Sequence, residues 1–397
     1  KAGDTITLRF AETLTPDSLI YIDNLRSAEA TDHYIMSGSD AQWHPMFTYH
    51  GFRYVEVKGL REKPVADDFE GLVFYDAMPT TGSFETSDEI INAVYRNAYW
   101  GIRGNYRSMP TDCPQRDERL GWTGDTQIFA RTALYNSDAK DFYRKWMRDL
   151  RNSQREDGAY PDIAPYNNFW GYGTAAWGDA GVILPWTVYE MTGDRTILEE
   201  NYASMTRYMQ WLSTQEETVE GKRYTHIGAG TATGDWLAYA PIESRYVSMA
   251  YYAYVAQLMD SISATLGKQR EAESYRALYA DIRQEFQQRY MLPDGALREH
   301  TQTAYLLALR FDLLPEQHRA AARQALRRLI EENDYFLSTG FVGTGILCST
   351  LTDEGMNDLA YALLLQRKNP SWLYSIDQGA TTVWERWDSY KREEGFH

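Results

Sequence analysis

Short runs of alternating apolar and polar positions occupy residues 1–63, a pattern typical of β-strands. The clearest run is 47–60 (FTYHGFRYVEVKGL), in which apolar side chains alternate with Arg53 and Glu56. Turn residues separate it from three further runs at 6–14, 19–25 and 32–38. These residues are therefore predicted to form part of a β-sandwich domain, whose first strands are expected to lie before Lys1.

A connector follows at residues 64–85, rich in proline and glycine and with one strand-like run at 71–78 (GLVFYDAM). The spacing of apolar residues then changes. Thr86 and Glu89 match a capping box, in which a threonine caps a helix and a glutamate three positions later reaches back. Apolar residues from Ile90 to Ala98 recur at the helical interval, so a helix is predicted to begin here.

From this point to the end, the pattern predicts helix after helix without an intervening strand. Eleven candidate segments lie near 87–106, 125–136, 139–154, 176–192, 195–214, 244–265, 269–290, 301–312, 316–332, 341–351 and 354–366. Helices paired across loops of varied length suit a toroid of helical hairpins better than a four-helix bundle. The chain is thus predicted to be mainly α, with an (α/α)6 barrel over residues 86–397 whose last helix is expected beyond His397.

Composition excludes several classes of protein. Among 397 residues, 56 are acidic and 40 basic, and the net charge of −16 would repel the phosphates of a nucleic acid. No window approaches the roughly 18 apolar residues of a membrane span. Cys113 and Cys348, the only cysteines, are too few for a disulfide scaffold or a metal-ligand cluster, although a single bridge between them stays open. The start shows neither an initiator methionine nor a signal peptide, so a fragment or processed form is expected and localisation stays open.

The most crowded polar stretch is 112–125 (DCPQRDERLGWTGD), with four carboxylates and two arginines. Pro114 and the pair Gly121 and Gly124 favour a loop that folds back over a continuous helix. Carboxylates this close raise the electrostatic energy unless a site uses them. The plain alternative is an exposed, charge-rich loop.

Four other loops or helix ends also place polar groups beside aromatic residues. They are 157–181, 230–239 (GTATGDWLAY), 337–345 (LSTGFVGTG) and 369–390 (NPSWLYSIDQGATTVWERWDSY). The whole chain holds 12 Trp and 30 Tyr, and sugar rings stack their C–H faces on such side chains. Aromatic packing in a large helical core is the simpler explanation of composition alone, but tryptophan recurring beside carboxylates in loops favours a carbohydrate site.

Paired carboxylates are the chemistry of glycosidic bond cleavage, in which one carboxyl protonates the leaving oxygen and another activates water or attacks. The sequence lacks a phosphate-cradling glycine loop, an H-E-x-x-H motif and a nucleophile elbow. Its seven histidines are scattered without ligand spacing. A cation site, such as a structural calcium held by Asp162 or Asp179, remains an open alternative.

The stretch 112–125 resembles the signature of the α-L-rhamnosidases of glycoside hydrolase family 78. Other blocks of that family are resembled, in the same order, by AAWGDAGVILPW, GDWL, STGFVGTG, NPSW and ATTVWERWDS. The run FTYHGFRYVEVKGL resembles the end of the β-sandwich domain that precedes the family's catalytic barrel. The resemblance covers nearly the whole chain, and its first and last motifs are long and specific.

This resemblance implies an (α/α)6 barrel that hydrolyses terminal α-L-rhamnosides of glycans or glycosides with inversion of configuration and without a required cofactor. It implies that Glu118, in the D-E-R step, is the general acid and that Glu385, in W-E-R-W, is the general base. The sugar contacts of the family fall on Asp112, Arg116, Trp122, Asp125, Trp177 and, less directly, Trp236.

These residue types suit a 6-deoxy sugar. Asp112 and Asp125 can accept hydrogen bonds from ring hydroxyls, and Arg116 can donate them. The three tryptophans would form an apolar wall that favours the methyl group of rhamnose, because a hydroxyl buried there without a partner costs about 1–3 kcal/mol.

One feature of the family is not matched. Its members place a sugar-contacting histidine soon after the W-E-R-W block, and His397 is not given that role. The family's C-terminal β-domain is likewise expected beyond this chain. Two alternatives stay open: an (α/α)6 carbohydrate-active enzyme with another sugar specificity, and a non-catalytic sugar-binding homologue. The presence of both Glu118 and Glu385 counts against the second.

Overall fold

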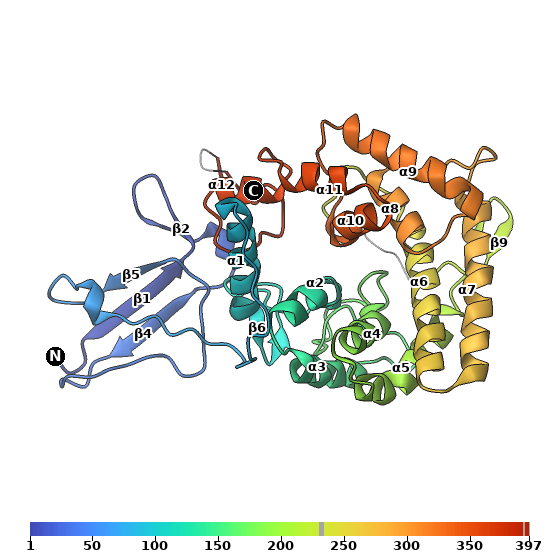
Figure 1. Cartoon of the computed structure of the whole chain (residues 1–397). Helices are drawn as coiled ribbons and strands as arrows, with labels where there is room; N and C mark the ends of the chain where they lie inside the picture. Colours follow the sequence, from blue (N-terminus) through green and yellow to red (C-terminus); the bar gives the residue numbers. More distant parts are fainter. Residues whose placement is uncertain (230–233, 392–393, 397) are drawn as a thin grey trace.

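A small β-domain (residues 1–63) leads into a ring of helices in the computed structural model, which describes residues 1–229, 234–391 and 394–396 (Figure 1). The β-domain strands are β1 (Thr5–Ala11), β2 (Thr13–Leu14), β3 (Ile20–Tyr21), β4 (Thr31–Ile35) and β5 (Tyr54–Lys58). Three of them form an antiparallel sheet in the order β4-β1-β5, with Leu8 opposite Asp32 on β4 and Val57 on β5. A 3-10 turn, η1 (Asp23–Leu25), follows β3 and supplies part of the small core of this domain.

The connector joins no sheet, so the strand predicted at 71–78 is wrong. This segment lies instead against the residue that follows the first helix (Glu89–Asn105), where the Asp76 N–H donates to the Tyr106 carbonyl at 3.0 Å. A second 3-10 turn, η2 (Ala66–Asp68), lies in the connector. The apolar run resembles a strand in composition, but a strand needs a neighbouring row of backbone groups that this position does not offer.

All eleven predicted helical segments are present. In the described part of the chain the helices are α1 (Glu89–Asn105), α2 (Thr123–Asn136), α3 (Lys140–Asn152), α4 (Ala180–Thr192), α5 (Thr196–Leu212), α6 (Ser244–Thr265), α7 (Gln269–Tyr290), α8 (Gln302–Arg310), α9 (Glu316–Glu331), α10 (Phe341–Asp353), α11 (Asn357–Leu364) and α12 (Trp372–Asp377). The short α12 lies in the NPSW segment, where a loop was predicted. Its six residues make fewer than two turns, too few for a helical period to show in the sequence.

Short hairpins, which the sequence did not predict, interrupt the helices. They pair β6 (Tyr106–Arg107) with β7 (Met109–Pro110), β8 (Glu217–Val219) with β9 (Lys222–Tyr224), and β10 (Tyr390–Lys391) with β11 (Gly395–Phe396). The start of α1 also differs from the prediction. Asp88, not Thr86, caps this helix, and its side chain accepts from the Ile90 N–H at 2.9 Å.

The even-numbered helices α2, α4, α6, α8 and α10 pack against one another in succession, and α10 returns to α2. The ring closes on its outer side where α1 packs against α12, and Figure 1 shows these two helices side by side. Inner and outer helices differ in burial. Every residue from Gln302 to Leu309 of α8 is buried, whereas α9 buries Ala322, Ala325, Leu326 and Ile330 along one stripe.

This arrangement is an (α/α)6 toroid, as predicted. One continuous hydrophobic core runs through it, and a separate small cluster around Phe10 and Leu25 lies under the β-sheet. No helix in the described ranges combines the length and apolar character of a membrane crossing.

Candidate active site

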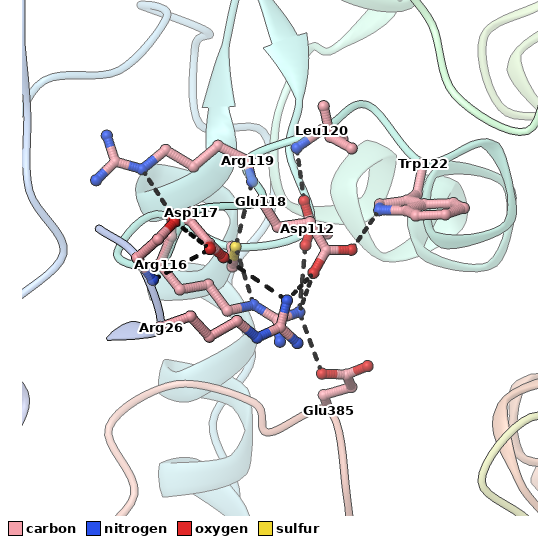
Figure 2. A network of polar contacts seen from close by, with 11 residues as sticks. Arg26, Asp112, Arg116, Asp117, Glu118, Arg119, Leu120, Trp122 and Glu385 are labelled. Carbon is pink, nitrogen blue, oxygen red and sulfur yellow. Dashed lines mark hydrogen bonds and ion pairs between the residues drawn. The ribbon is translucent and has the colours of Figure 1, made fainter. Parts of the chain in front are cut away.

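The residues 112–122, here called the motif loop, connect β7 to α2 and fold back on themselves as predicted. Two hydrogen bonds between Asp112 and Leu120 join the beginning of the loop to its end. The Asp112 N–H donates to the Leu120 carbonyl at 3.0 Å, and Oδ1 of Asp112 accepts from the Leu120 N–H at 2.7 Å. Trp122 is the residue before the first turn of α2 and has extended backbone angles. The loop thus gathers its polar side chains beside the start of α2, where Figure 2 shows them directed toward one another.

Arg116 joins three carboxylates at the centre of the site. Its Nη2 lies 3.1 Å from Oε2 of Glu118, 3.3 Å from Oε2 of Glu385 and 3.4 Å from Oδ2 of Asp112. Both predicted catalytic glutamates therefore contact one nitrogen atom, although 267 positions separate them in the sequence (385 − 118). The Oε2 atoms of Glu118 and Glu385 therefore lie no further apart than the sum of their distances from Nη2 of Arg116.

Glu118 receives two further donors. The Trp122 indole Nε1 donates to its Oε1 at 2.9 Å, and Nη1 of Arg26, from the β-domain, donates to its Oε2 at 3.0 Å. The side chain of Glu118 is only 15% exposed, whereas that of Glu385 is 50% exposed. The first carboxyl is therefore held from several sides, and the second has room beside it for a water molecule.

Burial dominates the electrostatics of the two aspartates. It raises the pKa of Asp112, with the charge of Glu118 adding to the shift and the Leu120 N–H opposing it. Asp125, on the first turn of α2, is partly buried, and desolvation together with the neighbouring charge of Asp112 raises its pKa to about 8. The crowding expected from the sequence is thus relieved by keeping one carboxyl protonated near neutral pH.

Contacts with distant helices fix the segment that carries Glu385. Asn97 of α1 donates to the carbonyls of Ala380 and Thr382 at 3.1 and 3.3 Å. Trp387 packs edge-on against Trp372 of α12, with ring centroids 5.5 Å apart. The placement of Glu385 therefore depends on the closure of the ring between α1 and α12.

The predicted aromatic contacts divide into buried and exposed residues. Trp177 is buried, stacks on Phe341 with ring centroids 5.6 Å apart, and covers Gly124 at the start of α2. Trp236 is 42% exposed, and its carbonyl accepts from the Phe341 N–H at 2.8 Å. Phe341, the first residue of α10, thus links both tryptophans. It was not predicted as a site residue, although the STGFVGTG run that contains it was singled out.

Asp235 has a structural function that the sequence did not reveal. Its buried carboxylate accepts from the N–H groups of Gly340, Val342 and Gly343 at 2.8, 2.7 and 3.2 Å, and from the Thr303 hydroxyl. These donors belong to the first turn of α10 and to α8. Asp235 therefore ties the loop of Trp236 to the helix that carries Phe341.

The two aspartates considered for a cation are engaged by protein donors. Asp162 accepts from the N–H and hydroxyl of Thr174 at 3.0 and 2.7 Å. Asp179 accepts from the Ala176 N–H and the Tyr208 hydroxyl, and burial raises its pKa to about 6. Across the residues that the structure describes, no group of three or more His, Cys, Asp and Glu side chains is placed to hold a metal ion. A structural calcium remains an untested expectation.

His397 lies outside the described residues. Both cysteines are free thiols, and Cys113 lies under Arg116, whose Nε contacts its sulfur at 3.3 Å. Burial raises the pKa of the Cys113 thiol to about 11.

Comparison with known proteins matches the chain to two family models. Residues 79–396 match the bacterial α-L-rhamnosidase six-hairpin glycosidase domain, and residues 1–75 match the bacterial α-L-rhamnosidase concanavalin-like domain. An α-L-rhamnosidase of Streptomyces avermitilis is 44% identical over the full chain, and one of Formosa agariphila is 42% identical. The chain spans 38% and 43% of the lengths of these relatives.

Solved structures show the same similarity. The S. avermitilis α-L-rhamnosidase complexed with L-rhamnose superposes on the whole chain with a TM-score of 0.95, and the chain covers 38% of it. The enzyme from Aspergillus terreus superposes with a TM-score of 0.91 at 36% identity, over 100% of this chain and 47% of that one.

Proposed function

The chain belongs to the α-L-rhamnosidases of glycoside hydrolase family 78, and from this membership we propose that the protein hydrolyses terminal α-L-rhamnosides. The substrate is a rhamnose-containing oligosaccharide, polysaccharide or glycoside. The observation that supports this most strongly is the pair of glutamates on Arg116, with Glu118 at 3.1 Å and Glu385 at 3.3 Å from one nitrogen. Glycoside hydrolysis needs two carboxyl groups at such a site, one on each side of the scissile bond.

In this proposal Glu118 is the general acid and Glu385 the general base. Glu118 protonates the glycosidic oxygen as the bond to the anomeric carbon breaks. Glu385, the more exposed of the two, removes a proton from the water that attacks that carbon from the opposite face. Both steps use only protein carboxyls and water, so the proposal includes no cofactor.

The sugar is held beside this pair. Asp112 and Asp125 accept hydrogen bonds from ring hydroxyls, and Arg116 exchanges one of its carboxylate contacts for a hydroxyl. Trp122, Trp177 and Trp236 provide apolar surface for the ring and for its methyl group. Their differing exposure suits this division, since the buried Trp177 can shape the floor and the exposed Trp236 the rim.

Hydrolysis of a chromogenic aryl α-L-rhamnoside tests the proposal. We expect turnover by the wild type, a loss of several orders of magnitude in Glu385→Gln, and no change in Glu199→Gln, a surface variant on α5. Equal rates in all three proteins would overturn the catalytic assignment. Turnover of another aryl glycoside in preference to the rhamnoside would favour a different sugar specificity, and rhamnose binding without turnover would favour a non-catalytic homologue.

Inversion of configuration is the finer part of the proposal. Inverting enzymes separate their carboxyl groups by about 6.5–9.5 Å, and retaining enzymes by about 5–5.5 Å. The two distances from Arg116 set only an upper limit on the separation of the two glutamate oxygens, so the anomeric form of the product is the decisive measurement. NMR during hydrolysis should show β-L-rhamnose first. A first-formed α-anomer would refute inversion while leaving the hydrolytic activity intact.

A further inference from the structure

The β-domain contacts the motif loop along one continuous edge. The Ser27 N–H and hydroxyl donate to Oδ2 of Asp117 at 3.2 and 2.6 Å, and Arg119 donates to the Tyr49 carbonyl at 3.2 Å. Arg26 precedes Ser27 in the chain, and its Nη1 donates to Oε2 of Glu118 at 3.0 Å. Figure 2 shows its guanidinium beside that of Arg116, directed at Glu118 from the opposite side to Trp122.

Arg26 differs from the other two partners of Glu118 in one respect. Trp122 and Arg116 are both assigned to the sugar, and Arg116 also divides its contacts among three carboxylates. When a hydroxyl of the substrate engages Arg116, the hold of this arginine on Glu118 weakens. Arg26 comes from another domain, 92 positions earlier, and is not assigned to the sugar. Its guanidinium lies 3.0 Å from Glu118 and 3.7 Å from Asp117.

The backbone of Arg26 shows that this placement is imposed by its surroundings. Arg26 has φ +58° and ψ −119°, a region that residues with a Cβ rarely adopt. The two hydrogen bonds from Ser27 to Asp117 fix the chain directly after it. The same bonds hold the pKa of Asp117 below its usual value, so the anchor is ionised at neutral pH.

We propose that Arg26 of the β-domain is a positioning residue for the general acid, so that the active site is completed only when the β-domain and the barrel are docked together. Arg26 holds Oε2 of Glu118 in place while the substrate occupies Arg116, the other cation on this oxygen. This inference rests on the proposed function and on the assignment of Glu118.

Charges on several elements face Glu118, and the test must separate Arg26 from them. They are Arg26 of the β-domain, Arg116 and Asp112 of the motif loop, Asp125 of α2, and Glu385 of the C-terminal segment. Only Arg26 can be altered without touching a residue assigned to the sugar or to the attack of water.

The experiment compares Arg26→Gln, Arg26→Lys and Arg53→Gln in the full chain. Arg53 also joins the β-domain to the barrel, by donating to the Gly379 carbonyl at 3.2 Å, but it does not contact Glu118. Each variant is assayed on an aryl α-L-rhamnoside, whose leaving group needs little protonation, and on an alkyl or sugar-linked rhamnoside, whose leaving group needs it.

We expect Arg26→Gln to lower kcat on the poor leaving group by about tenfold or more, with a much smaller loss on the aryl substrate and little change in KM. The ratio of kcat on the aryl substrate to kcat on the poor leaving group should therefore rise above the wild-type ratio. Arg26→Lys should restore part of the rate, and Arg53→Gln should behave as the wild type.

Equal losses of kcat on both substrates would overturn the inference, and so would wild-type behaviour of Arg26→Gln. If the wild type cleaves neither rhamnoside, the proposed function fails instead. A lowered melting midpoint identifies a variant that unfolds. If Arg26→Gln unfolds, the ratio of kcat on the two substrates is measured in Arg26→Lys instead. A lower overall rate with the wild-type ratio would count against positioning.

Discussion

Trp122 donates its indole N–H to Oε1 of Glu118 at 2.9 Å, across a turn in which the motif loop ends and α2 begins. The two residues are four positions apart, but they do not share a helix. Their contact depends on the reversal of the loop, which Asp112 closes through Leu120. One side chain thus holds the proposed acid and is at the same time proposed to contact the sugar.

Trp122→Phe should therefore affect protonation more than binding. Phenylalanine keeps an aromatic face beside Trp170, which packs edge-on against Trp122 at 4.9 Å, but it removes the N–H donor. A hydrogen bond to a charged group contributes about 1.5–3 kcal/mol, so we expect kcat on a poor leaving group to fall by about 10- to 100-fold. Steady-state kinetics check this. A raised KM with unchanged kcat would show that Trp122 contacts the sugar only.

Gly124→Ala should disturb the position of Trp177. A Cβ at Gly124 would lie 2.6 Å from the indole Cε2, closer than carbon atoms approach. We expect a loss of about 1–3 kcal/mol in the free energy of unfolding and a lower affinity for rhamnose. Gly101→Ala on α1 is the matched control. It meets nothing within 4 Å and should raise stability by about 0.5–1 kcal/mol. Denaturant unfolding of both variants decides.

Asp125→Asn should change the pH dependence of stability. The folded-state pKa of Asp125 is about 8, far above the ordinary value of 3.8, so the folded protein retains a proton that the unfolded chain loses. The stability that this proton confers is full below about pH 4 and is lost as the pH rises towards 8, by at most about 1.4 kcal/mol per pH unit. Asparagine is neutral throughout. The melting midpoint of the variant, relative to that of the wild type, should therefore rise as the pH increases from 4 to 8. A difference in melting midpoint that does not change with pH would contradict the raised pKa of Asp125.

Asp235→Ala should destabilise the barrel. It leaves the N–H groups of Gly340, Val342 and Gly343 without their buried acceptor, and we expect a loss of about 3 kcal/mol or more. Asp353→Ala is the control, because its carboxylate pairs with Arg310 at the surface and is 63% exposed. That change should cost about 1 kcal/mol or less. Equal unfolding free energies for the two variants would show that Asp235 does not anchor α10.

Many elements of this chain could be predicted because they depend on local patterns. The alternation of 47–60 predicted β5, and helical spacing predicted eleven helices within a few residues of their observed ends. The shortest elements were not predicted, because α12 and the two-residue strands contain too few positions for a periodic pattern to appear. The cap of α1 was misassigned because Thr86 and Asp88 are both good caps, and only the backbone path selects Asp88.

By itself, then, the sequence determined which segments are helical, which loops carry the carboxylates, and, through its resemblance, the family of the chain. These follow from interactions between residues close together in the chain, where spacing alone predicts the neighbours. Tertiary structure decided which side chains meet. Closure of α1 on α12 brings Glu385 to Arg116, and docking of the β-domain brings Arg26 to Glu118. Such contacts depend on the packing of the whole ring, and no short stretch of sequence encodes them.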